Sequence, residues 1–356
     1  MTSGKILRLL LMAALTPPLL YHVRNLAFGW GMWPVWHWML TAAAILAAGL
    51  AGAAAFWWPA QRVNKLLQGL EVLARYCVAF LLIFFAINKV IPGQFLLYNR
   101  DFDLPLRDLP PRRLAWHFLG HSPLYYGFIA ASEFIAGVLL CWSRTALGGL
   151  LLAAGVMLNV VAVDVAFGIR ALPIAATMAL AALVMLAGQL HMLRPLVWRA
   201  RSDTKEASWL TRNDLLSLGV LVVILGFSLN EGVRTRRGLM RQLPPAGRWE
   251  VVECSPNPGL ALCQPRKDGT RSVLYLEVGL WGQLVTDSER RGLAFTYDHA
   301  SKNLEITVQP RDSTAEPNLI LRGTVAATDT TVVLQASSQG MAPFDVRLRR
   351  THHAPW

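Results

Sequence analysis

Hydrophobic residues between positions 1 and 230 gather in seven runs of about 20 residues, the length that crosses a bilayer core of about 30 Å. Each run is too long and too apolar for a buried helix of a soluble domain. The pattern predicts an α-helical polytopic membrane protein with about seven transmembrane helices, at about 6–23, 36–58, 72–91, 123–142, 146–168, 171–192 and 213–230.

The first run has two interpretations. Lys5 and Arg8 precede its apolar part, as basic residues do in a signal peptide, but no small-residue cleavage motif follows. Pro17 and Pro18 interrupt the run instead, so we favour a retained span with a kink at the two prolines. A cleaved signal peptide is the alternative.

The hydrophobic pattern of the sequence changes its period after about residue 245. Short alternations of apolar and polar residues, such as RWEVVEC, NLEITVQ and FDVRLRR, recur about every ten residues, with turn sequences such as KDG between them. Period-2 alternation is typical of antiparallel strands with one face on a core. About eight strands are predicted, which favours a small all-β domain, a barrel or a sandwich, outside the membrane.

The composition agrees with a membrane protein that carries a polar domain. The chain has 356 residues, 54% hydrophobic and 16% charged, with a mean hydropathy of +0.38, whereas soluble domains carry about 25% charged residues. Its formal charge of +12 comes from Lys and Arg in short clusters beside apolar runs, where such residues report orientation and contact anionic headgroups. The charge therefore indicates the lipid bilayer as a partner and argues against nucleic acid.

Basic residues alone do not orient the chain, because about eleven Lys and Arg lie on each side of the predicted spans. Cys254 and Cys263 give a second argument. They enclose SPNPGLAL, whose Pro and Gly residues favour a turn that brings two sulfurs together. A disulfide between them persists only in an oxidising compartment, so this pair would place the β domain outside the cytoplasm and, after seven spans, the N-terminus inside.

Ionisable residues inside apolar runs are costly and are therefore candidates for function. Glu133 lies about eleven residues into the fourth run, near mid-depth of the membrane at about 1.5 Å per residue. Ile129, Ala130, Ala136 and Gly137 share its helical face, and the three small residues among them indicate contact with another helix. Two interpretations stay open: a protonated Glu that joins two helices, or a carboxyl that handles protons or binds a ligand.

More polar residues gather near the ends of the third and fifth runs. Asn88, Lys89 and Gln94 lie at the end of the third run, and Asp164 lies near the end of the fifth. Both ends face outward in the orientation above, so a Lys89–Asp164 ion pair is geometrically possible. The alternative is that Lys89 snorkels to headgroups while Asp164 meets water. Asn159, further back in the fifth run, lies on a stripe of small residues typical of helix packing.

Standard catalytic and metal-binding motifs do not occur in the sequence. It has no C-x-x-C, H-E-x-x-H, P-loop or G-x-S-x-G motif, and His117, His121 and His191 lack metal-ligand spacing with carboxylates. We therefore expect no metal site and no standard hydrolase or nucleotide chemistry.

Two stretches carry a family resemblance. RYCVAFLLIFFAINKVIPGQF, followed by LAWHFLGHSPLYYGFIAASEFIAGVLLCWSRTALGGLLLAAGVMLNVVAVDVAF, resembles the DoxX-like bacterial membrane proteins over about 75–195. More loosely, the chain is similar to longer relatives with additional spans and a C-terminal β domain. The residues at the matching places are Arg75, Lys89, Pro92, Gln94, Phe95, Gly120, Ser122, Pro123, Glu133, Arg144, Thr145, Asn159 and Asp164.

The resemblance implies a four-helix core and hence a division of the chain. We expect N-terminal transmembrane helices over 1–71, the DoxX-like four-helix core over 72–195, a linker and last helix over 196–240, and the extramembrane β domain over 241–356. Because DoxX-like proteins are bacterial, it also implies the bacterial inner membrane, and a β domain outside the cytoplasm, as the cysteine pair indicates, would then lie in the periplasm.

The resemblance implies less about the activity of the protein than about its fold. Some DoxX-related proteins resemble subunits of quinone-linked sulfur oxidoreductases or accompany redox-stress enzymes, so the first hypothesis is a redox-associated or quinone-linked membrane subunit with a quinone as candidate cofactor. Its candidate intramembrane site consists of Asn88, Lys89, Gln94, Glu133, Asn159 and Asp164. The alternative is a non-enzymatic membrane protein whose β domain binds a partner protein or lipid, the polar residues fixing only the helix packing.

Overall fold

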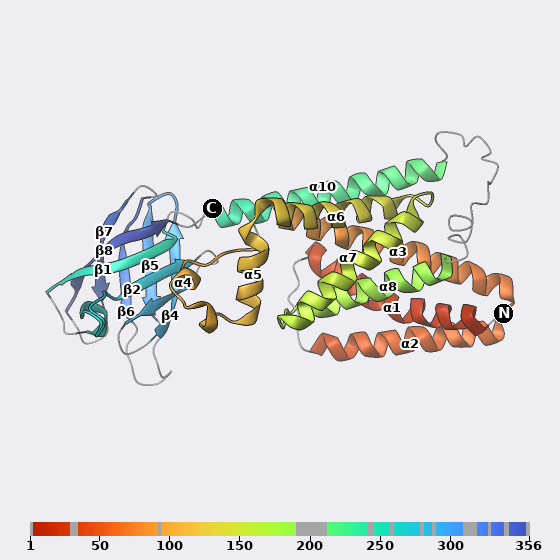
Figure 1. The fold of residues 1–356 in the computed structure, drawn as a ribbon, viewed down its shortest axis with the longest axis horizontal. Coiled ribbons are helices and arrows are strands. Elements are labelled where there is room, and N and C mark those ends of the chain that lie inside the picture. The colour runs from red at the N-terminus through yellow and green to blue at the C-terminus, as the bar shows by residue number, and fades with distance from the viewer. Residues whose placement is uncertain are drawn as a thin grey trace. The chain divides into compact units, whose positions relative to one another are not determined.

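The computed structural model of the protein describes residues 3–28, 35–91, 94–189, 212–240, 245–256, 260–277, 281–286, 290–308, 319–326, 329–337 and 342–353 (Figure 1). The chain divides into two compact units. The helical unit comprises Met1–Gln94 and His121–Gly232, and the barrel unit comprises Phe95–Gly120 and Val233–Trp356. Each unit has a hydrophobic core of its own.

Long apolar helices make up the helical unit. They are α1 (Ser3–Phe28), α2 (Val35–Trp57), α3 (Ala60–Val90), α6 (Pro123–Cys141), α7 (Ala146–Ala166), α8 (Leu172–Gln189) and α10 (Arg212–Met240), the end of which belongs to the barrel unit. Among the described residues, six helices are long and apolar enough to cross a membrane, namely α1, α3, α6, α7, α8 and α10, and α2 adds a shorter apolar stretch, Thr41–Trp57. The prediction of a helical membrane region is thereby confirmed.

Four helices, α3, α6, α7 and α8, form a closed core. α3 packs along α6, α6 along α7 and α7 along α8, and α8 contacts α3 again. Glycines permit the closest approaches: a Cβ on Gly137 of α6 would lie 2.7 Å from Ile83 of α3, and one on Gly149 of α7 would lie 2.9 Å from Leu140 of α6. These contacts fix the spacing of the helices that carry the predicted polar site.

Helix α1 packs against α2, α3 and α8. Pro17 and Pro18 lie inside α1 and do not end it. Near the start of the helix, Arg8 Nε donates a hydrogen bond of 2.5 Å to Glu71 of α3, and the Arg8 guanidinium covers Gly188 of α8. This polar contact joins α1 to the four-helix core.

The barrel unit contains a closed, eight-stranded barrel. Its strands are β1 (Gly247–Ser255), β2 (Val273–Glu277), β3 (Trp281–Val285), β4 (Arg290–Asp298), β5 (Asn303–Val308), β6 (Leu319–Thr324), β7 (Thr331–Ser337) and β8 (Phe344–His353). Each strand pairs antiparallel with the next, and β8 pairs with β1. The eight predicted alternating segments are these strands, so the expectation of a small all-β domain is confirmed. Of the two predicted alternatives, the domain is a barrel and not a sandwich.

Side chains fill the inside of the barrel. Burial alternates along β4, β5 and β7, as expected when every second side chain points inward. Trp249 of β1 is the largest fully buried side chain among the described residues, and its Nε1 donates to the carbonyl of Pro245 at 2.9 Å. Ile306, Leu334 and Val346 lie in the same core. The barrel core is therefore formed by its own side chains.

The segment Phe95–Gly120 belongs to the barrel unit, although the sequence pattern grouped it with the four-helix core. Its elements are α4 (Asn99–Phe102), the 3-10 turn η1 (Leu106–Asp108) and α5 (Pro111–His121). α4 contacts β1 and β2. Hydrophobic periodicity does not reveal this grouping, because the contacts between segment and barrel are made by polar side chains.

The structure joins Cys254 and Cys263 in a disulfide, with the two Cα atoms 5.7 Å apart. Cys254 lies on β1, and Cys263 ends the 3-10 turn η3 (Ala261–Cys263). Cys77 and Cys141 are free and buried in the helical unit.

Candidate functional site

A buried ion pair lies between α3 and α6. Lys89 Nζ is 3.0 Å from Oε1 and 2.7 Å from Oε2 of Glu133, so both carboxylate oxygens accept from one ammonium. The side chains are only 7% and 3% exposed. Lys89 also lies 5.8 Å from the ring centroid of Phe85, one turn earlier on its own helix. The pair is therefore shielded from solvent by helix packing and an aromatic face.

Close helix contact explains why these two residues meet. Gly137 lies one turn from Glu133 on the same face of α6, and without a side chain it lets α6 approach Ala79 and Ile83 of α3. Lys89 stands in the last turn of α3. Its long side chain extends back along the helix toward the N-terminus, as helical side chains do, and so reaches the carboxylate.

Asp164, near the end of α7, is the third ionisable group. It is 4% exposed, and its Oδ2 has no hydrogen-bond partner among the described residues. The Lys89–Asp164 ion pair that the sequence left possible does not form in the described structure, because Lys89 makes its direct contacts with Glu133. Neither does Lys89 reach outward to headgroups, since its side chain is buried.

The other three predicted residues have different environments. Asn88 Nδ2 donates to the carbonyl of Phe84 at 2.9 Å, so its amide bonds its own helix. Gln94 Oε1 is buried without a described hydrogen-bond partner. Asn159 is exposed, and its stripe neighbour Gly155 faces open space. Asn159 therefore lies outside the buried group, and the expected small-residue packing at this stripe is not found among the described residues.

One ammonium and two carboxyl groups are thus buried within the same four-helix core. Uncompensated buried charge is strongly unfavourable, so the group is neutral when one carboxyl carries a proton. An ammonium has three N–H donors, and its bonds to the two oxygens of Glu133 account for two of them. Among the described residues, one donor of Lys89 and one oxygen of Asp164 have no hydrogen-bond partner.

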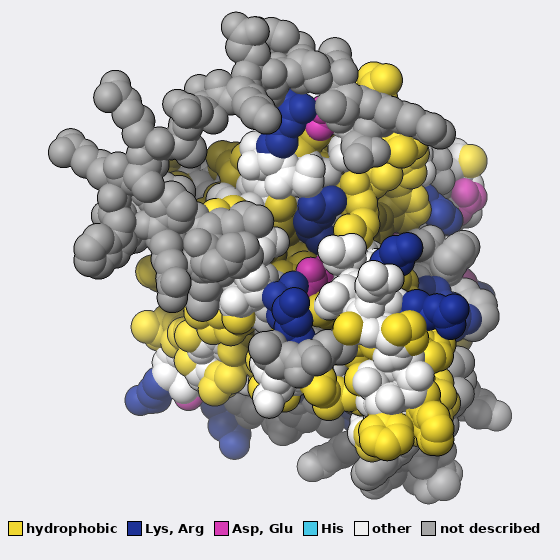
Figure 2. All heavy atoms as spheres, turned by 90° about the vertical axis from the view of Figure 1, so that its right-hand side faces the viewer, with side chains coloured by type: hydrophobic (Ala, Val, Ile, Leu, Met, Phe, Trp, Pro, Cys, Tyr) yellow, Lys and Arg dark blue, Asp and Glu magenta, His cyan; other side chains and the backbone are white. Residues whose placement is uncertain are grey.

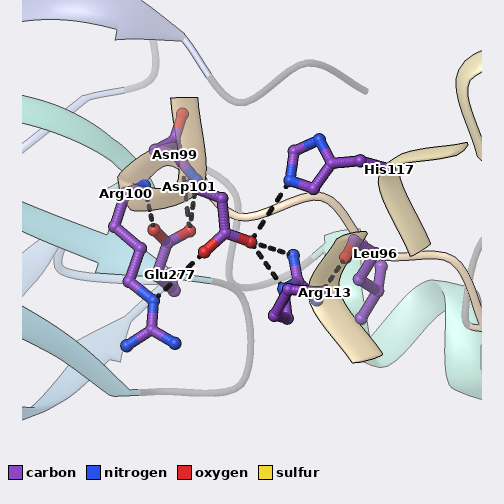
Figure 3. Close-up of polar contacts among 7 residues, drawn as sticks. All are labelled: Leu96, Asn99, Arg100, Asp101, Arg113, His117 and Glu277. Carbon is purple, nitrogen blue, oxygen red and sulfur yellow. Dashed lines mark hydrogen bonds and ion pairs between the residues drawn. The ribbon is translucent and has the colours of Figure 1, made fainter. Parts of the chain in front are cut away.

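A second polar cluster lies in the barrel unit and was not predicted (Figure 3). Asp101, on α4, is fully buried at its carboxylate. Its Oδ2 accepts from Arg113 Nε at 2.5 Å and lies 3.3 Å from His117 Nε2, and both residues come from α5. Arg113 also stacks over Tyr98, 3.9 Å from the ring centroid. The cluster folds α4 against α5.

Glu277, at the end of β2, binds the same segment to the barrel. Its carboxylate accepts from the backbone N–H groups of Asn99 and Arg100, each at 3.0 Å, and from Asn99 Nδ2 at 3.2 Å (Figure 3). Burial raises the pKa of Glu277 above its usual value, and these donors offset part of that rise. A carboxyl in this position holds the start of α4 on the barrel rim.

Asp103 adds a third contact between segment and barrel. Its Oδ2 accepts from Arg248 Nε at 2.6 Å and from the hydroxyl of Tyr275. Burial acts to lower the pKa of Arg248, but hydrogen bonds with Glu250 and Asp103 hold it above its usual value. The sequence shows the acidic residues and arginines of this loop, but nothing in their spacing indicates which strand receives them.

No group of three or more His, Cys, Asp or Glu within the described ranges is placed to hold a metal ion. His117 has one carboxylate neighbour, Asp101, which Arg113 already neutralises. The Asp101 cluster is therefore best explained as a structural link, and the Lys89, Glu133 and Asp164 group is the candidate functional site. Comparisons of the chain with protein-family models, curated proteins and solved structures found no match.

Proposed function

We propose that this chain is a DoxX-type, redox-associated protein of the bacterial inner membrane, whose Lys89, Glu133 and Asp164 group binds a quinone-like carbonyl and exchanges a proton beside it. The observation that carries the proposal is the burial of one ammonium and two carboxyls together at helix positions within the apolar core. Ionisable groups inside membrane helices are rare and usually serve a pathway or a ligand.

The residues fit such a ligand in two respects. Lys89 keeps one N–H donor beyond its two contacts with Glu133, which suits a carbonyl oxygen. Asp164 offers a buried oxygen with no described hydrogen-bond partner, which suits a group that takes up or releases a proton. A bound quinone would supply two-electron chemistry, and the role of these residues would be to orient it and to hold the proton.

Seven spans and an outward barrel belong to the same proposal. Counting α2 with the six long apolar helices gives an odd number of crossings. The Cys254–Cys263 disulfide supports a barrel in an oxidising compartment, which in bacteria is the periplasm. An alkaline phosphatase fusion after the last strand should be active in intact cells; an active cytoplasmic reporter at that position would contradict the orientation.

The quinone proposal is tested by binding. Protein purified in mild detergent should carry an extractable quinone, and Glu133→Gln and Lys89→Met should each remove most of it. Asn159→Ala is the matched control, because this amide is polar and exposed on α7 but lies outside the group. Absence of quinone from folded wild-type protein, together with unchanged quinone binding by both variants after reconstitution, would reject the proposal.

A hollow on the barrel unit favours a second candidate, binding of an acidic partner. Val233, Arg236, Arg237 and Met240 of α10 and His299 line a depression of about 460 Å³. Two arginines side by side attract carboxylate or phosphate groups. Cross-linking from Met240→Cys, which lines the same hollow, should then capture a partner in membranes, and adding Arg236→Glu should abolish capture. Quinone content unaffected by Arg236→Glu would separate this function from the first.

A further inference from the structure

An apolar groove runs along the helical unit between α1, α2 and α3. It holds about 520 Å³, within the range of about 300–1,000 Å³ of ligand pockets. Its lining residues are Ala13, Thr16, Pro17, Ala47, Leu50, Ala51, Ala53, Ala54, Trp57, Trp58, Leu66 and Leu70. Leu50 and Trp57 are 63% and 78% exposed, so the groove is accessible from the side of the bundle. None of the charged groups of the candidate functional site lines it.

The length of the groove along α2 matches the thickness of one lipid leaflet. From Trp57, the last residue of α2, to Ala47, the helix rises about 15 Å at about 1.5 Å per residue. Half of a hydrocarbon core of about 30 Å is about 15 Å. The indoles of Trp57 and Trp58 lie at one end of the groove, where aromatic residues mark the level of lipid headgroups. A single acyl chain fits these dimensions.

The same end of the groove is basic. Arg62 lies one turn before Leu66 and two turns before Leu70, so it shares their face of α3. Arg62 and Lys65 are exposed, and neither makes an ion pair with another described residue. Figure 2 looks at the end of the helical unit where the N-terminus lies and shows Lys and Arg side chains scattered among hydrophobic ones. Cations beside an apolar slot complement an anionic headgroup on an acyl chain.

We infer that this groove is a binding site for an anionic phospholipid. The acyl chain lies along Leu50, Ala54 and Leu66, and the phosphate meets Arg62 and Lys65 beside the two tryptophans. The site is independent of the proposed quinone function.

Native mass spectrometry of delipidated full-length protein tests the inference. Phosphatidylglycerol should bind more tightly than phosphatidylcholine with the same chains, and Arg62→Ala should weaken it by about fivefold, the effect of one basic residue at a lipid surface. Arg170→Ala is the control, because Arg170 is exposed between α7 and α8 and distant in sequence from the groove. High salt should reduce the preference for phosphatidylglycerol.

A second variant tests the acyl-chain slot. Ala54→Trp fills the groove and should abolish tight binding of both lipids, whereas Leu46→Trp, on an exposed part of α2 that does not line the groove, should not. Both substitutions keep an apolar residue on α2. The melting temperature of each variant shows whether it is folded. Equal affinity for the two lipids, or undiminished binding by folded Ala54→Trp protein, overturns the inference. Loss of a dimer rather than of lipid in Ala54→Trp protein also overturns it, since the groove would then hold a second copy.

Discussion

At the residue scale, burial distinguishes the Lys89–Glu133 pair from the exposed ion pairs of the chain. The Arg322–Glu305 pair on the barrel is 62% and 42% exposed, and such pairs contribute about 0–1 kcal/mol. Lys89 and Glu133 are almost fully buried, so removal of one partner leaves a charge without compensation. The free-energy cost then comes from desolvation more than from the lost contact.

We therefore expect Lys89→Met and Glu133→Met each to destabilise the helical unit by about 3–5 kcal/mol, while the double variant recovers most of the loss. Denaturant titration in mixed micelles measures the three free energies of unfolding. In an Asp164→Asn background, Glu133→Met should cost more, because Asp164 can no longer accept the cation. Arg322→Met is the exposed control and should change stability by less than about 1 kcal/mol. If the change in the free energy of unfolding of the double variant equals the sum of the changes of the two single variants, the two side chains do not interact.

Glu250 of β1 should make the stability of the barrel depend on pH, and the direction of its pKa shift gives the direction of that dependence. Burial alone would raise the pKa of Glu250, but hydrogen bonds from Arg248 and Arg349 lower it below its usual value of 4.5. A carboxyl with a lowered folded-state pKa stabilises the fold above about pH 4.5, and this contribution is lost as the pH falls through the folded-state pKa. The barrel should therefore lose stability below pH 4.5.

Hydrogen exchange of β1 and β8 in the full chain, between pH 7 and pH 3, measures this loss. Glu250→Gln should reduce the change, because the titrating group is gone. Glu253→Gln is the matched control on the same strand, since Glu253 pairs with Arg347 with both side chains more than half exposed. If Glu250→Gln protein shows the same acid-induced loss as wild type, other carboxyls must account for it.

At the element scale, the approach of α6 to α3 depends on Gly137. A Cβ there would lie 2.7 Å from Ile83 Cγ1 and 3.0 Å from the carbonyl of Ala79. Both distances are shorter than ordinary contacts, so even a methyl group must push the helices apart. Gly155 on α7 has open space around its Cβ position, which makes it a control of the same residue type.

Gly137→Ala should destabilise the helical unit by about 1–3 kcal/mol, as overpacking does, and should weaken the Lys89–Glu133 contact one turn away. Gly155→Ala should be neutral or slightly stabilising, because alanine has the higher helix propensity. Melting temperatures in detergent provide the comparison. Equal melting temperatures for the two variants would indicate that α3 and α6 adjust without cost.

At the scale of the whole molecule, the chain folds as two units with separate cores, each with its own stabilising contacts. The helical unit depends on helix packing and one buried charged group. The barrel unit depends on strand closure, on the polar contacts of Glu277 and Asp103, and on a disulfide. Treatments that act on one core should therefore have little effect on the other.

The disulfide provides the test. Cys254→Ser with Cys263→Ser should destabilise the barrel unit by about 2–3 kcal/mol, the loop-closure value for a short loop, and leave the helical unit unchanged. Hydrogen exchange reports each unit separately in the intact protein. Wild-type protein with a reductant is the control and should resemble the double variant. A parallel loss of protection in both units would show that they unfold together.

The sequence by itself determined the elements of this protein, because hydrophobic period is a local property. Runs of about 20 apolar residues became long helices, and period-2 segments became eight strands. Even Cys254 and Cys263, close in sequence around a turn, could be paired in advance. The polar residues of the membrane core were identifiable because charge in an apolar run is conspicuous.

Only the tertiary structure decided which of these polar residues meet. The choice of Glu133 over Asp164 as the partner of Lys89 depends on the close approach of two helices at Gly137, and the outward position of Asn159 depends on how α7 is rotated. The assignment of Phe95–Gly120 to the barrel depends on hydrogen bonds to Glu277, more than 170 positions later in the chain. Such contacts arise from the packing of segments that are distant in the sequence, so the local periodicity of the sequence does not predict them.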